Sequence, residues 1–126
     1  QVDFNEAEKE AEQSLKLLQY IGDRRSQAMI LLHMSEIKFY RQAYETALAL
    51  AYESLEIFRD LKIRLQIAIA LYNMGHYYNR LQNKEKATDS WAEALQIAVE
   101  LKNQNLINRL QENINLVKDE RMTSNS

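Results

Sequence analysis

The sequence predicts an all-α fold, built as an α-solenoid in which about six helices stack as antiparallel pairs. The first observation is the scarcity of turn residues, because the 126-residue chain has two Gly and no Pro. Tight turns and β-bulges depend on those residues, so a β-rich fold is not expected. The second observation is an internal repeat of 40 residues, and the third is apolar spacing typical of amphipathic helices.

The repeat becomes visible when the sequence is shifted by 40 residues. Large apolar residues then coincide with large apolar residues, and small residues with small ones. The matching sets are Leu15, Leu55 and Leu95; Ile21, Leu61 and Leu101; Ala7, Ala47 and Ala87; and Ser14, Ser54 and Ala94. Because both size classes keep their order, the repeat predicts a structural unit that stacks along the chain.

Apolar residues three and four positions apart predict the helices in turn. The expected helices are Asn5–Ile21, Arg24–Tyr40, Tyr44–Leu61, Arg64–Arg80, Lys84–Lys102 and Gln104–Glu120. Gly22 is placed to end the first helix, because glycine readily adopts the left-handed conformation. Asp23, Asn83 and Asn103 stand at later joints, where their side chains can cap the helices that follow.

We therefore interpret residues 1–122 as one helical repeat domain. It consists of a half repeat at 5–22, full repeats at 24–62 and 64–102, and a C-terminal capping helix at 104–120. The small polar residues 123–126 are expected to form a disordered tail. The capping helix carries one apolar stripe, Ile107, Leu110, Ile114 and Val117, while its other faces are polar, as the end of a stacked array requires.

The first helix has no such polar outer face. Ala7, Ala11 and Ser14 are small, at positions where the matching helices accept the helix before them. We expect either that the intact protein continues upstream of Gln1 or that this face pairs with another chain, as in a homodimer. The start at Gln1, without a signal-peptide pattern, is interpreted as that of a fragment or a processed chain.

The second period resembles the tetratricopeptide repeat. The residues that carry the resemblance are Leu71, Met74, Gly75 and Tyr78 in its first helix and Ala87, Trp91 and Ala94 in its second. The first period departs from the family pattern at Lys38 and Ala51. The resemblance covers about residues 5–120 and implies a right-handed superhelix. The 40-residue period is similar to that of bacterial peptide-sensing regulators, kinesin light chains and polarity scaffolds.

The same resemblance implies that the first helix of each pair lines a concave groove for a peptide or protein segment. Carried over residue by residue, the groove positions are Leu32, His33, Glu36, Phe39, Tyr40, Tyr72, Asn73, His76, Asn79, Arg80 and Asn113. Asn73 is the central candidate, since an Asn side chain offers both donors and an acceptor to a peptide amide. Asn113 follows 40 residues later in the same register, whereas His33 takes that place in the first period.

Three functions remain open from the sequence. The leading expectation is a non-enzymatic module that binds a peptide or protein partner. One alternative is a regulatory sensor domain of a bacterial peptide-responsive signalling protein, and the other is self-association through the first helix. An enzyme is not expected, because no group of residues supplies a nucleophile, a base and an oxyanion site together.

Composition argues against several other classes of function. The chain has no Cys, and its two His residues lack the spacing of a metal site, so neither a metal nor another cofactor is expected. The net charge of −2 argues against nucleic-acid binding, which needs a basic face. No apolar run approaches the roughly 20 residues of a membrane span. The lack of Cys and of a visible signal predicts a cytoplasmic protein.

Overall fold

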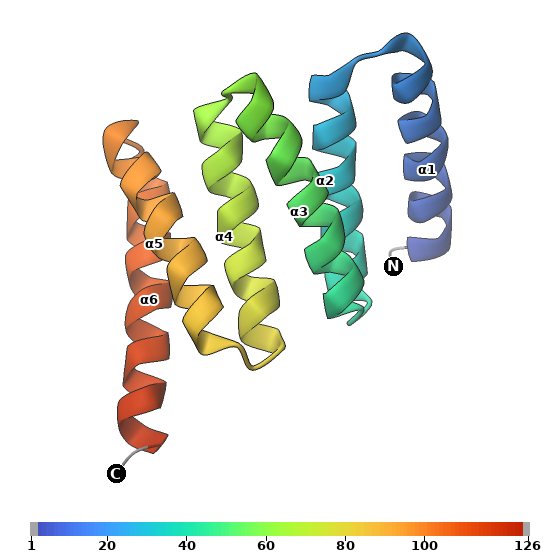
Figure 1. The fold of residues 1–126 in the computed structure, drawn as a ribbon. Helices are drawn as coiled ribbons and strands as arrows, with labels where there is room; N and C mark the ends of the chain where they lie inside the picture. The colour runs from blue at the N-terminus through green and yellow to red at the C-terminus, as the bar shows by residue number, and fades with distance from the viewer. Residues whose placement is uncertain (1–2, 125–126) are drawn as a thin grey trace.

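The computed structural model describes residues 3–124, which form six α-helices joined by short turns (Figure 1). The helices are α1 (Phe4–Ile21), α2 (Arg24–Tyr40), α3 (Tyr44–Leu61), α4 (Arg64–Arg80), α5 (Lys84–Glu100) and α6 (Gln104–Ser124). The predicted bounds of α2, α3 and α4 are confirmed. The expected disordered tail is wrong at residues 123 and 124, because α6 continues through them, and its last two residues lie outside the described part of the chain.

Each helix packs against the next one along the chain, and successive helices run in opposite directions (Figure 1). The two termini lie at opposite ends of the resulting array. This arrangement confirms the α-solenoid predicted from the repeat. Contacts also skip a helix, because α2 touches α4 and α6 touches α4, and they bring the first helices of the pairs together with α6.

Left-handed residues end the first five helices at a constant spacing. Gly22, Gln42, Lys62, Gln82 and Lys102 all have positive φ angles, between 56° and 77°, so this conformation recurs every 20 residues. Only the first is glycine, although the conformation costs other L-residues roughly 1–2 kcal/mol. At each joint the following N–H bonds back to a carbonyl of the last turn, as Ile63 N–H does to Phe58 O at 3.1 Å. Such bonds satisfy carbonyls that the helix end leaves without a partner.

The predicted side-chain caps are confirmed at three joints. Oδ1 of Asp23, Asn83 and Asn103 each accepts a hydrogen bond from the backbone N–H three residues ahead, at 3.1–3.2 Å. Ala43 and Ile63 occupy the same position before α3 and α4 and form no side-chain cap. Among the second helices, α1 and α5 therefore begin with a polar cap, whereas α3 does not. Helix α4 also lacks a polar cap, and Ile63 before it packs against the core.

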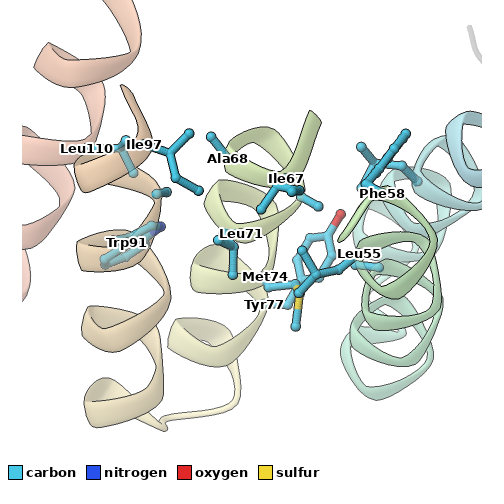
Figure 2. Packing of buried hydrophobic residues seen from close by; sticks show 14 of the residues in the cluster. Leu55, Phe58, Ile67, Ala68, Leu71, Met74, Tyr77, Trp91, Ile97 and Leu110 are labelled. Atoms are coloured by element: carbon cyan, nitrogen blue, oxygen red, sulfur yellow. The ribbon is translucent and has the colours of Figure 1, made fainter. Parts of the chain in front are cut away.

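The second pair, α4 and α5, depends on a small residue beneath a large one. A Cβ atom added at Gly75 would lie 2.1 Å from Nε1 of Trp91, well inside van der Waals contact. The indole is buried against α4 beside Leu71, and its Nε1 donates a hydrogen bond to Tyr72 O at 3.1 Å (Figure 2). The absence of a side chain at Gly75 therefore creates the space that the ring fills.

In the first pair, α2 and α3, different residues occupy the two positions that Gly75 and Trp91 hold in the second pair. Ser35 takes the place of Gly75, and Ala51 takes the place of Trp91. All the side-chain atoms of Ser35 are buried, and its Oγ donates to Leu32 O at 2.6 Å and lies 3.0 Å from the Tyr77 hydroxyl. The smaller residue at position 51 therefore accompanies a larger residue at position 35, and the hydroxyl of Ser35 links this pair to Tyr77 of the next one.

The two ends of the array differ in polarity. On α6, Leu110 and Val117 are buried while Asn108, Gln111 and Asn115 are exposed, which confirms the predicted polar outer face. On α1, the last two turns expose large apolar side chains: Leu17 is 61% exposed, Tyr20 89% and Ile21 61%. The exposed apolar side chains of α1 lie close together in sequence, whereas the two on α6, Leu116 and Met122, are six residues apart.

Replacement of Gly75 by Ala tests the packing beneath Trp91. In a helix interior this change normally stabilises a protein by about 1 kcal/mol. Here we expect it to lower the free energy of unfolding by about 1–3 kcal/mol, because the new methyl group displaces the indole. Urea denaturation followed by circular dichroism measures the change.

The matched control is the same substitution in a Trp91→Ala background. Without the ring, the methyl group has space, and Gly75→Ala should become neutral or stabilising by up to about 1 kcal/mol. The same loss in both backgrounds would show that the indole does not set the size limit at position 75.

Candidate functional site

The first helices of the pairs form one continuous surface with α6, here called the α2–α4–α6 face. Helices α2 and α4 contact each other, and a polar contact joins α4 to α6. Between α2 and α4 the surface is hollowed by about 340 Å³. This central hollow is lined by Glu36, Phe39, Tyr40, Tyr72, Asn73, His76 and Tyr77. It combines aromatic rings with a carboxylate, an amide and an imidazole.

A second depression, the N-terminal hollow, lies between α1 and α2 and measures about 350 Å³. Its lining residues are Phe4, Ala7, His33, Glu36, Ile37 and Tyr40. Phe4, Ala7 and Ile37 give it apolar walls, and His33 and Glu36 line it almost entirely with apolar atoms. Glu36 and Tyr40 line both hollows, so the two depressions adjoin each other along α2.

A third depression of about 330 Å³, the C-terminal hollow, lies between the starts of α4 and α6. It is lined by Leu65, Ile69, Asn103, Asn105, Leu106 and Arg109. The α2–α4–α6 face therefore offers recesses at both ends as well as in the middle.

Two amide side chains link neighbouring helices across this face. Asn73 Nδ2 donates to Glu36 Oε1 at 3.4 Å, from α4 to α2. Asn113 Nδ2 lies 3.3 Å from His76 Nε2, from α6 to α4. The same register position thus makes the same kind of contact in two successive repeats. The first bond is long, so Asn73 can exchange Glu36 for a ligand at small cost.

His76 occupies a half-buried position among aromatic rings. Its ring centroid lies 4.8 Å from that of Tyr72 and 5.3 Å from that of Trp91, edge to face in both cases. Burial, and to a smaller extent the charge of Arg80, lowers the pKa of His76 below its usual 6.5. Its Nε2 can accept the Asn113 hydrogen bond only while it carries no proton. The surroundings of His76 therefore favour the neutral imidazole.

Tyr77 closes the floor of the central hollow from α4. Its ring centroid lies 5.1 Å from that of Phe39, and its hydroxyl contacts Ser35. Burial raises the pKa of Tyr77 to about 12, against the effect of the Ser35 hydrogen bond, and the charge of Glu36 adds to the rise. The phenol is therefore a neutral, structural group.

The predicted groove residues fall into three groups, apart from Asn113, which lines none of the three hollows but contacts His76 from α6. The first group lines the two adjoining hollows and consists of His33, Glu36, Phe39, Tyr40, Tyr72, Asn73 and His76. The prediction is wrong for Leu32, which is 4% exposed and belongs to the core, because that side of α2 packs against α3. The third group, Asn79 and Arg80, lies at the end of α4.

Asn79 and Arg80 line none of the three hollows and have other partners. Asn79 Oδ1 accepts a hydrogen bond from Lys84 Nζ at the start of α5. The Arg80 guanidinium lies 5.7 Å from the Phe39 ring centroid and 5.9 Å from that of Tyr44. These contacts connect α4 to its neighbours.

The sequence prediction missed Phe4, Ala7, Ile37 and Tyr77. Phe4 and Ala7 come from α1, a second-type helix, whereas the family resemblance assigns the groove to first helices. Ile37 and Tyr77 are mainly core residues whose edges reach a hollow. The signal that could have found them is register, because 37 and 77 are 40 residues apart on the same helix position.

Comparison with known proteins adds no relative: no family model matches the chain, and no curated protein matches its sequence. Within residues 3–124, no three His, Cys, Asp or Glu side chains gather as metal ligands would. None of the helices in this described part is both long and apolar enough to cross a membrane.

The depressed pKa of His76 predicts a pH dependence of folding. Below pH 6.5 the unfolded chain takes up a proton on this residue before the folded chain does, so stability falls as the pH falls towards the lower, folded-state pKa. At higher pH the residue is neutral in both states and has no effect. We expect His76→Gln to flatten the dependence of unfolding free energy on pH between about 5 and 6.5.

Urea denaturation at several pH values measures this slope, and His33→Gln, at an exposed position, is the matched control. An unchanged slope in His76→Gln would contradict the assignment of the dependence to this residue.

Proposed function

We propose that the chain is a non-enzymatic binding module of the tetratricopeptide kind, which holds a peptide or protein segment along the α2–α4–α6 face. The observation that carries the proposal is the pair of adjoining hollows, which share Glu36 and Tyr40. They provide recesses for side chains, and Asn73 stands at the rim of one of them with its amide in a single long hydrogen bond.

The chemistry of this surface is suited to recognition of a peptide. Tyr40 is 69% exposed, and Tyr72 is half-buried, so both rings can contact a ligand while their packing limits their motion. Aromatic side chains with a polar group are favoured at interfaces for this reason. The Asn73 amide can pair with both the N–H and the C=O of an extended backbone. Together these groups favour a chain segment over a compact small molecule.

The same groups give little support to catalysis. His76 is held neutral, and among the described residues its hydrogen-bond and ring partners are Asn113, Tyr72 and Trp91, with no Ser or Lys among them. A general base needs a nucleophile within hydrogen-bond reach. The polar side chains of the hollows are therefore assigned to binding.

A displayed library of random dodecapeptides provides the probe for this proposal. Peptides selected on the unmodified chain should lose about 10- to 100-fold in affinity for Asn73→Ala combined with Tyr72→Ala, because an amide pair and an aromatic contact disappear together. Isothermal titration calorimetry measures the affinity, and circular dichroism checks that helicity is kept.

The matched control replaces the same residue types elsewhere. Tyr52 on α3 and Asn115 on α6 are exposed and line none of the three hollows. Tyr52→Ala with Asn115→Ala should leave the affinity unchanged. Equal binding by the two double variants would place the peptide site on another surface.

Self-association through α1 is the second candidate, favoured by a specific observation. Leu17, Tyr20 and Ile21 are all more than half exposed and lie within two turns of one helix. Surface apolar groups that gather in this way often mark an interaction site. The matching residues of the later helices are better covered: Ile57 is half-buried and Ile97 buried, and Leu61 and Leu101 are 38% and 42% exposed against 61% for Ile21.

Sedimentation equilibrium at several concentrations tests this candidate. If α1 is the interface, the average mass should rise with concentration, and Leu17→Ser with Ile21→Ser should return the chain to the 14.8 kDa monomer. A mass that stays monomeric at all concentrations would eliminate self-association.

A further inference from the structure

We infer that the ligand of the α2–α4–α6 face carries a basic side chain beside a large apolar one, with the apolar group in the N-terminal hollow and the Lys or Arg head on Glu36. This inference rests on the proposed function, since it names the chemistry of the segment that the groove binds. It follows from the position of Glu36, which lines both hollows, because the N-terminal hollow is apolar whereas the central hollow also has polar groups.

Glu36 is an exposed carboxylate without a cationic partner in the described part of the chain. The Lys and Arg residues that follow it most closely in the sequence are engaged elsewhere. Lys38 and Arg41 both bind Glu8 of α1, at 3.3 and 3.2 Å. The one hydrogen bond recorded for the Glu36 carboxylate is the long bond from Asn73. The carboxylate therefore keeps lone pairs for an incoming donor.

Arg80 is the cation of α4 that comes closest to this region, and it too is occupied. Its guanidinium lies over the rings of Phe39 and Tyr44, at 5.7 and 5.9 Å from their centroids. It forms no ion pair with Glu36 within 4 Å. Arg80 lines none of the three hollows, so its charge does not provide a binding site for an anionic ligand group inside them.

Aromatic side chains line the hollows together with Glu36. Tyr40 lines both hollows with Glu36, and Tyr72 and Phe39 line the central one. A cation over such a ring gains roughly 0.5–2 kcal/mol from the quadrupole, in addition to its bond with a carboxylate. An anionic ligand group would meet both the Glu36 charge and the negative ring faces. The Glu36 charge and the aromatic lining therefore both favour a cationic ligand group.

The N-terminal hollow supplies the apolar half of the pattern. Phe4, Ala7 and Ile37 form its walls, and its volume of about 350 Å³ exceeds that of a single aromatic or branched aliphatic side chain. Because it meets the central hollow at Glu36 and Tyr40, a side chain seated there places its neighbour along the peptide beside the carboxylate. The two hollows thus bind one apolar and one basic residue of the ligand side by side.

Selection from a displayed library of random dodecapeptides tests this preference. The chain is panned as the unmodified protein, as Glu36→Gln and as the control Glu53→Gln, an exposed acid on α3 that lines none of the hollows. We expect Lys or Arg beside a large apolar residue to be enriched on the unmodified chain and on Glu53→Gln. On Glu36→Gln the apolar preference should remain while the basic preference disappears.

A binding cycle then measures the pairing. Replacing the selected basic residue of a peptide by Gln should weaken binding to the unmodified chain about tenfold, and to Glu36→Gln less than about twofold. Equal losses on both proteins would overturn the inference. If that happens while Asn73→Ala still weakens the peptide, the groove remains the site and only its charge preference is wrong. If no selected peptide depends on Asn73, the proposed function fails, and this inference fails with it.

Discussion

The close approach of the two helices within a pair is the constraint on which the rest of the structure depends. In the second pair it is set by the contact between Gly75 and Trp91, and in the first pair Ser35 and Ala51 occupy the corresponding positions. In both cases a small residue on one helix is matched by the size of the residue at the paired position of the other. This matching keeps the pairs alike in spacing although their side chains differ, and interior packing leaves little tolerance for a mismatch.

Similar spacing in each pair is also what creates the binding surface. Because α3 packs against both α2 and α4, and α5 against both α4 and α6, Asn73 can reach Glu36 and Asn113 can reach His76. The polar side chains of this face therefore bridge helices and remain accessible at the same time. A ligand that takes over such a bond competes with a weak internal contact and leaves the buried core untouched.

The helices and their caps were predictable because they follow from local chemistry. Asp23, Asn83 and Asn103 cap their helices as their side chains allow, and 40-residue register located the pairs. Other features depend on tertiary contacts that one sequence does not reveal. Gln42 and Lys62 adopt a conformation that their types disfavour, and Leu32 turns inward because α3 covers its side of α2. Phe4 reaches the N-terminal hollow only because α1 packs beside α2.

The even recurrence of the left-handed joints has a consequence for how such arrays change in length. A copied segment fits only if its ends meet equivalent joints and its partners stay matched in size. Residues 64–103 satisfy both conditions, since the segment carries Gly75 with Trp91 and ends one residue after the joint at Lys102. A copy of 44–83 would set Ala51 against Gly75 and leave a void where the indole belongs. Gene duplication or deliberate elongation therefore proceeds by whole helix pairs that start with the first helix.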